Sequence, residues 1–189
     1  MKETITLGGA DFTLRDMKAD DKDAMLAFAG TLPAHDLLFL RRDIRQPRVV
    51  DAWIEATGAG AFNSVLAERD GEIVGCVALY TDPFSWSPHV GDLRVLVAEA
   101  ARQHGLGRHM VQQGFRIALD KGLSKLTAQM TADQKGAITV FEELGFRGEA
   151  LLKDHVQDAT GALHDLVTLS CDVANAARRL EAYGIGESA

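Results

Sequence analysis

The segment that decides the fold of this chain is residues 95–108, with the sequence VLVAEAARQHGLGR. It starts with β-branched and apolar residues typical of a strand, and it ends with Gly105 and Gly107 at the start of a predicted helix. Glycine lets the backbone approach a ligand closely, and a helix N-terminus offers unpaired N–H groups and the positive end of the helix dipole. The segment therefore predicts a turn that binds a diphosphate.

Two other phosphate-binding patterns do not fit this segment. A P-loop needs G-x-x-x-x-G-K-[ST], but Gly107 is followed by Arg108 and His109. A dinucleotide-binding fingerprint that starts at Gly105 needs a small residue where the chain has Met110. The remaining alternative is a strand–turn–helix junction whose glycines only satisfy the turn geometry.

A second motif lies at residues 133–146, with the sequence DQKGAITVFEELGF. Ala137, Val140, Phe141 and Leu144 recur at helical spacing, which predicts a short amphipathic helix. Gly145 is placed to end that helix in a left-handed conformation before the chain enters another strand.

The two motifs, in this order, resemble motifs A and B of the GNAT superfamily of acyl-CoA-dependent N-acyltransferases. Arg102, Gly105 and Gly107 match R/Q-x-x-G-x-G/A, and the second segment is similar to N-x-x-A-x-x-x-Y-x-x-x-G-F. The resemblance spans about residues 62–172. It implies an α/β (α+β) fold with a mixed, mostly antiparallel sheet of six or seven strands, flanked by helices and splayed at the cofactor strand. It also implies one domain over residues 1–189, with acceptor-side helices at about 20–60 and an acetyl-CoA-binding core at about 62–172.

The resemblance implies acetyl-CoA as co-substrate. Loop amides would hold the pyrophosphate, and the main chain of Val95 and Val97 would pair with the pantetheine arm. Gln134 stands where the family usually has an asparagine that contacts the cofactor. The residues expected to bind acetyl-CoA are Val95, Leu96, Val97, Arg102, Gln103, His104, Gly105, Leu106, Gly107, Arg108, Gln134 and Phe141.

Asp92 is the expected catalytic residue. A lysine-like amine with a pKa of about 10.4 is neutral in only about four molecules in ten thousand at pH 7, so a general base assists acyl transfer. Asp92 lies early on the cofactor strand, where many GNAT members carry a glutamate that acts through water. The alternative for Asp92 is a surface carboxylate paired with Arg94.

The general acid is where the sequence departs from the family. The motif B tyrosine is replaced by Phe141, and neither Tyr80 nor Tyr183 occupies that position. The leaving thiolate would then take its proton from water, from the amine or from another side chain. A thiol with a pKa near 8.5 is already a tolerable leaving group, so the loss slows the reaction without forbidding it.

The resemblance implies acetyl transfer to a primary amine by direct attack in a ternary complex. A non-catalytic acyl-CoA-binding sensor or regulatory module is the alternative. A protein lysine or N-terminus, a free amino acid, a polyamine and an antibiotic are all open as acceptors, and a homodimer is open as the assembly.

Composition restricts the class of protein. The chain has 189 residues, of which 47% are hydrophobic, and a formal net charge of −7, which argues against a nucleic-acid partner. No apolar run approaches a membrane span or a signal peptide, so we expect a cytoplasmic protein without a membrane partner. The two isolated cysteines, Cys76 and Cys171, are expected to be buried. The six histidines lack metal-motif spacing, so we expect no metal.

Hydrophobic periodicity completes the expected element order. The predicted strands lie at about 12–17, 63–69, 72–80, 90–98, 126–130, 147–156 and 163–171. The predicted helices outside the second motif lie at about 20–29, 47–58 and 106–120. Asp70-Gly71 is a strong two-residue hairpin signal between the second and third of these strands.

Overall fold

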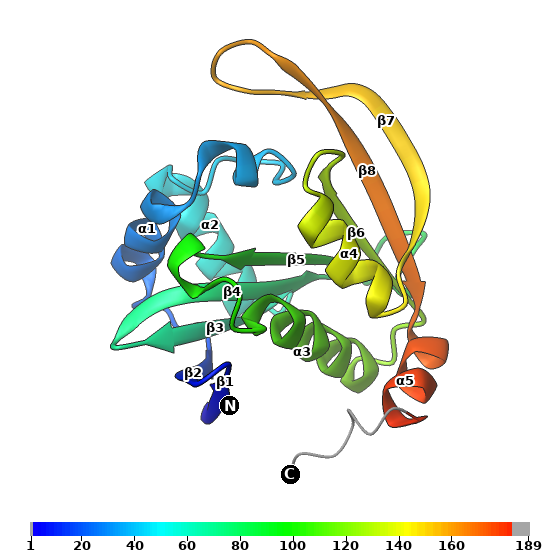
Figure 1. The fold of residues 1–189 in the computed structure, drawn as a ribbon, viewed down its shortest axis with the longest axis horizontal. Helices are drawn as coiled ribbons and strands as arrows, with labels where there is room; N and C mark the ends of the chain where they lie inside the picture. Colours follow the sequence, from blue (N-terminus) through cyan, green and yellow to red (C-terminus); the bar gives the residue numbers. More distant parts are fainter. Residues whose placement is uncertain (1, 183–189) are drawn as a thin grey trace.

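The computed structural model of the chain describes residues 2–182 and contains one eight-stranded sheet (Figure 1). The strands have the order β1-β2-β3-β4-β5-β6-β8-β7 along the sheet. All neighbouring pairs are antiparallel except β5 and β6, which are parallel. The strands are β1 (Lys2–Leu7), β2 (Ala10–Asp16), β3 (Phe62–Arg69), β4 (Glu72–Tyr80), β5 (Val90–Val97), β6 (Lys125–Thr131), β7 (Arg147–Gln157) and β8 (Leu163–Asp172).

The predicted fold class is confirmed, but the sheet has more strands than the six or seven expected. The additional strand is β1, which pairs with β2 across a turn at Gly8 and Gly9. Residues of β1 alternate between exposed and half-buried, so its apolar side never becomes fully buried. This weak alternation is why the sequence pattern did not reveal the strand.

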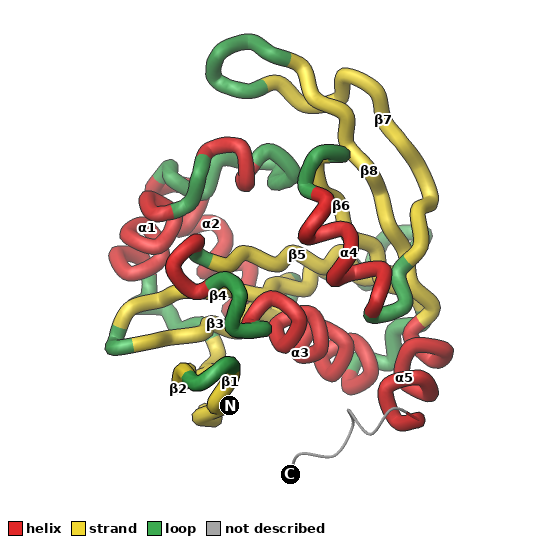
Figure 2. Tube along the Cα trace, viewed as in Figure 1, coloured by secondary structure: helices red, strands yellow, loops and turns green. Residues whose placement is uncertain are grey.

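Helices cover both faces of the sheet (Figure 2). The helices are α1 (Lys22–Thr31), α2 (Pro47–Gly58), α3 (Leu106–Asp120), α4 (Lys135–Glu143) and α5 (Val173–Ala182), with the short 3-10 helices η1 (Ala34–Leu37) and η2 (Glu99–Ala101). Helices α1 and α2 contribute Met25, Phe28 and Val50 to the core on one face. Helices α3, α4 and α5 line the core on the other face. Within residues 2–182, no helix is both long and apolar enough to cross a bilayer.

Helix α3 packs unusually close to β5. A Cβ atom added at Gly114 would lie 2.3 Å from Cδ1 of Leu93, a distance that no ordinary contact allows. Only glycine lets the helix approach the strand this closely. The close packing holds the middle of α3 against the middle of β5, and the first motif connects the end of this strand to the start of this helix.

The turn and helix signals of the sequence are confirmed. Asp70 and Gly71 have φ values of +53° and +83°, as a primed two-residue hairpin requires. Helix α2 begins at Pro47 and helix α3 occupies the predicted residues. Helix α1 begins and ends two residues later than predicted, and α5 was not predicted.

Candidate active site

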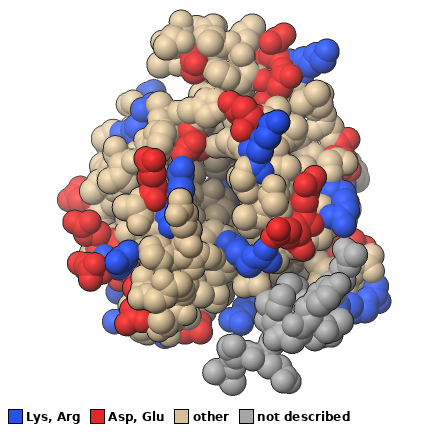
Figure 3. All heavy atoms as spheres, viewed as in Figure 1, with Lys and Arg blue, Asp and Glu red and all other residues tan. Residues whose placement is uncertain are grey.

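Strands β5 and β6 separate at the centre of the sheet. They pair only between residues 90–92 and residues 125–127. Beyond that point β5 continues to Val97 against β4, and β6 continues to Thr131 against β8. The predicted splay at the cofactor strand is therefore present, and Figure 3 shows a hollow near the centre of this face.

The backbone of Val95 and Val97 faces this splay. The N–H of Ala98 donates to the Val74 carbonyl of β4 at 2.8 Å, so Ala98 points toward β4. Successive residues of a strand direct their backbone groups to opposite edges. Val97 and Val95 therefore direct their backbone N–H and C=O groups toward β6. Hydrogen bonds to a pantetheine arm between the strands would need this orientation. Leu96 points its backbone toward β4 and buries its side chain on the α1 and α2 face, so its predicted cofactor contact remains a prediction.

The loop before α3 has the geometry of an anion site. Gln103 and Gly105 have φ values of +69° and +82°, and Gly105 is the residue that precedes the first turn of α3. Left-handed residues of this kind turn successive N–H groups toward one point, next to the positive end of the helix dipole. A Cβ atom added at Gly107 would meet only Cγ2 of Val97, at 3.9 Å. Space is therefore open beside the backbone of Gly107, and its predicted contact with the cofactor remains a prediction.

Most side chains of the predicted cofactor loop contact other parts of the protein. Nδ1 of His104 lies 3.2 Å from the Gly8 carbonyl oxygen, and the His104 ring packs against Phe12. Arg108 pairs with Glu143 at the end of α4, and Leu106 is buried. What the loop offers to a ligand is therefore chiefly its backbone amides.

Asp36, in η1, bridges the two sides of the splay. Its Oδ2 accepts a hydrogen bond from Nη2 of Arg102 at 2.5 Å, and its Oδ1 accepts one from Nε2 of Gln134 at 3.3 Å. The Arg102 guanidinium also donates to the Val97 carbonyl at 3.2 and 3.3 Å. The segment between α1 and α2 thus contacts both predicted cofactor-binding motifs. Sequence reasoning missed Asp36 because it lies in a short segment that matches no motif.

Asp92 lies on the face of the sheet that α1 and α2 cover. Its Oδ2 accepts hydrogen bonds from Nε and Nη2 of Arg94 at 3.1 and 2.7 Å. Tyr80 is the cross-strand neighbour of Asp92, and its ring packs 5.0 Å from the ring of Phe62. The pairing with Arg94 that the sequence left open is present, and the role of Asp92 as a base remains a prediction. Tyr80 had no sequence signal because only strand register places it there.

A family comparison agrees with this geometry. The model of the Acetyltransferase (GNAT) family matches residues 31–146. This chain belongs to the GNAT family. The predicted family is therefore confirmed, with acetyl-CoA as the co-substrate of GNAT acetyltransferases.

Curated relatives of this GNAT chain are mycothiol acetyltransferases. The one from Streptomyces avermitilis is 34% identical over 112 residues, which cover 56% of this chain and 32% of the relative. The one from Streptomyces coelicolor is 32% identical over 112 residues and covers the same shares. The chain therefore spans about a third of the length of these relatives.

Solved structures share the GNAT fold over most of the chain. A ribosomal-protein-alanine N-acetyltransferase from Brucella melitensis has a TM-score of 0.72 and 24% identity, covering 84% of this chain and 98% of its own. RimJ from Mycobacterium smegmatis, in complex with CoA-disulfide, has a TM-score of 0.74 and 19% identity, covering 97% and 94%. The yncA protein from Salmonella typhimurium, with its cofactor acetyl-CoA, has a TM-score of 0.74 and 19% identity, covering 86% and 94%.

Phe141, at the position of the GNAT motif B tyrosine, is a core residue on α4. Phe141 is 6% exposed, and its ring packs edge-on against the ring of Phe146 with centroids 4.9 Å apart. Its predicted contact with the cofactor remains a prediction. Tyr183, which the sequence excluded as a substitute, lies outside the described residues.

Proposed function

We propose that this GNAT chain is an acetyl-CoA-dependent N-acetyltransferase that acts on a primary amine by direct attack in a ternary complex. The observation that carries the proposal is the splay of β5 and β6, which ends at the left-handed loop of Gln103 and Gly105. A diphosphate on the loop amides would direct the pantetheine arm along the exposed edge of β5. The thioester would then lie between the two strands.

Binding of the cofactor would compete with the bridge made by Asp36. Arg102 is a cation at the diphosphate loop, and its guanidinium now contacts the Asp36 carboxylate. A bound diphosphate would attract the same guanidinium and repel the carboxylate. We therefore expect Asp36 to exchange its contact with Arg102 when acetyl-CoA binds.

The acyl transfer itself needs few protein groups. The amine nitrogen attacks the thioester carbonyl carbon, the carbon–sulfur bond breaks, and the sulfur leaves with its electron pair as the coenzyme A thiolate. Asp92 would receive the amine proton, directly or through water, and the thiolate would take a proton from solvent. Tyr80 and Arg94, which flank Asp92, would line the acceptor side.

A covalent acyl-enzyme has no suitable nucleophile among the cysteines. Cys76 and Cys171 are both buried, and burial raises the pKa of the Cys76 thiol far above its usual value. A thiol that cannot ionise is a poor nucleophile. Direct attack by the acceptor is therefore the simpler route.

The acceptor side would be built by the segment of about residues 20–60, within one domain of residues 1–189. Thr127 is next to Asp92 in the register of β5 and β6, and residues at alternate positions of β6 share its face. Gln129 and Thr131 therefore extend a polar row along the splay. Because curated relatives are mycothiol acetyltransferases, a small-molecule amine is the acceptor class we favour.

The test is release of free thiol from acetyl-CoA in the presence of a panel of amines that includes the acceptor of the mycothiol acetyltransferases. We expect thiol release that depends on both acetyl-CoA and one class of amine. A protein that binds acetyl-CoA but releases no thiol with any acceptor class would be an acyl-CoA sensor instead. Measuring acetyl-CoA affinity by calorimetry in parallel separates that outcome from a failure to bind.

A further inference from the structure

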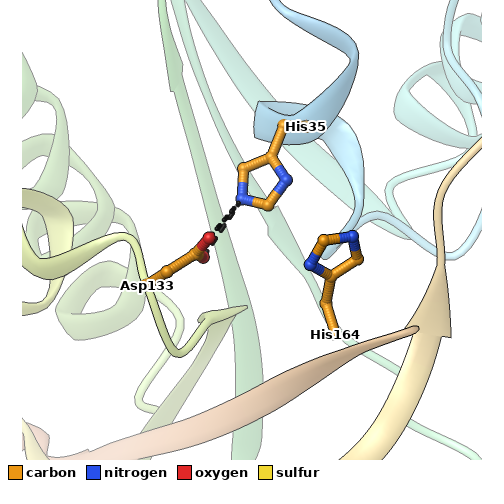
Figure 4. Close-up of side chains that lie close together, drawn as sticks. All are labelled: His35, Asp133 and His164. Atoms are coloured by element: carbon orange, nitrogen blue, oxygen red, sulfur yellow. Dashed lines mark hydrogen bonds and ion pairs between the residues drawn. The ribbon is translucent and has the colours of Figure 1, made fainter. Parts of the chain in front are cut away.

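Three metal-ligating side chains from distant parts of the sequence converge beside the splay. They are His35 of η1, Asp133 of the turn between β6 and α4, and His164 of β8 (Figure 4). One potential ligand atom from each side chain lies within 4.8 Å of the other two. We propose that these three side chains form a binding site for a divalent transition-metal ion of the zinc type.

The donor set fits such an ion. Imidazole nitrogen and carboxylate oxygen are ligands that Zn²⁺ prefers, and three protein ligands with one open position is a common arrangement. Nε2 of His35 already lies 3.0 Å from the Asp133 carboxylate oxygens. With bonds of about 2.0 to 2.1 Å, two tetrahedral ligands lie about 3.3 Å apart, so the separation of this pair is close to what the ion would need. His164 would move inward by about 1.5 Å to complete the set.

His164 is held in the orientation that a metal ligand needs. Its Nε2 lies 2.8 Å from Oδ2 of Asp158, which leaves Nδ1 as the nitrogen that would bind the ion. A histidine ligand commonly donates its other ring N–H to a carboxylate, which fixes its tautomer. Asp158 is itself fixed, since its Oδ1 accepts hydrogen bonds from Thr160 and from the N–H of Ala162.

The site is accessible from solvent. The side chains of His35, Asp133 and His164 are 35%, 62% and 23% exposed. An ion could therefore reach these three side chains from solvent.

An ion at this site would join three segments that border the active site. His35 precedes Asp36, and Asp133 precedes Gln134, so two of the ligands are chain neighbours of the bridge across the splay. His164 lies at the start of β8, on the long hairpin with β7. The ion would tie η1 and the hairpin to the end of β6 without touching the reacting atoms.

The test is calorimetric titration of the metal-free full chain with Zn²⁺ alone, followed by thermal melting with and without Zn²⁺. We expect one Zn²⁺ per chain and a higher melting temperature with the ion. His164→Ala should lose at least tenfold in affinity, and Asp158→Asn should lose about 10- to 100-fold, as for other outer-shell carboxylates. His155→Ala is the matched control, because His155 is an exposed histidine of the same hairpin, and it should bind as the wild type does.

Absence of saturable binding to the wild type would overturn the proposal, and so would equal losses in His164→Ala and His155→Ala. Asp133→Asn repeats the test with a side chain of the same size in case His164→Ala melts early. The titration uses no acetyl-CoA, so its result is independent of the acyl-transfer proposal.

Discussion

Replacing Asp36 by asparagine should tighten the binding of acetyl-CoA. In the free protein the Asp36 carboxylate contacts Nη2 of Arg102, at the loop where we place the diphosphate. Asp36→Asn keeps the size of the side chain and a weaker hydrogen bond, but it removes the negative charge. The guanidinium is then available to the diphosphate, and no carboxylate repels it.

The size of the effect follows from the exposure of the pair. The side chains of Arg102 and Asp36 are 42% and 22% exposed, so solvent screens their attraction strongly. Pairs of this kind contribute up to about 1 kcal/mol. If binding of acetyl-CoA no longer has to break this pair, the Kd of Asp36→Asn for acetyl-CoA should be about fivefold lower than that of the wild type. Because both interactions are screened charges, the gain should shrink as the salt concentration rises.

Calorimetry of acetyl-CoA binding at low and high salt measures both expectations. Asp43→Asn is the matched control, since Asp43 pairs with Arg45 in the same segment but does not contact the cofactor loop. An Asp36→Asn protein that binds acetyl-CoA no better than the Asp43→Asn protein would refute the reasoning. Asp36 would then hold η1 in place for the cofactor instead of competing with it.

Gly107→Val should weaken acetyl-CoA binding at least tenfold while the melting temperature stays near that of the wild type, because the added side chain meets ligand and not protein; unchanged affinity by calorimetry contradicts this. Asp92→Asn should lower kcat/KM by about 10²- to 10⁴-fold at neutral pH with nearly unchanged acetyl-CoA affinity, and a wild-type pH profile would make Asp92 a structural partner of Arg94 only. Phe141→Tyr should leave turnover unchanged or raise it, whereas denaturant unfolding that shows a loss above about 3 kcal/mol would place the para position in tight packing away from the cofactor. Gly114→Ala should lower the free energy of unfolding by about 1 to 3 kcal/mol, because its Cβ atom collides with Leu93; a smaller change would mean that the Leu93 side chain moves aside easily.

Local signals in the sequence predicted the elements whose structure depends on local chemistry. Pro47 marks the start of α2, Asp70-Gly71 forms the hairpin turn, and the glycines of the first motif precede α3. Each of these features needs only a few neighbouring residues, so a single sequence reveals it.

Features created by the tertiary arrangement had no such signal. Asp36 contacts Arg102 and Gln134 only because η1 packs across the splay. The side chains of His35, Asp133 and His164 meet without any regular spacing in the sequence. Sheet register alone places Tyr80 beside Asp92. These contacts depend on how distant segments pack against one another. Residue patterns within a single segment do not reveal that packing.

The short pairing of β5 with β6 has a mechanical consequence. The sheet consists of two parts, β1 to β5 and β6 to β8. Only the pairing of residues 90–92 with residues 125–127 joins them. After this pairing ends, the edge of β5 offers backbone donors and acceptors. An extended ligand with amide groups can form hydrogen bonds with them as a neighbouring strand would. A pantetheine arm lying there would extend the hydrogen-bonded connection between the two parts of the sheet and couple their motions. The co-substrate would then serve as an additional strand of the fold, and each turnover would remove and restore part of the sheet.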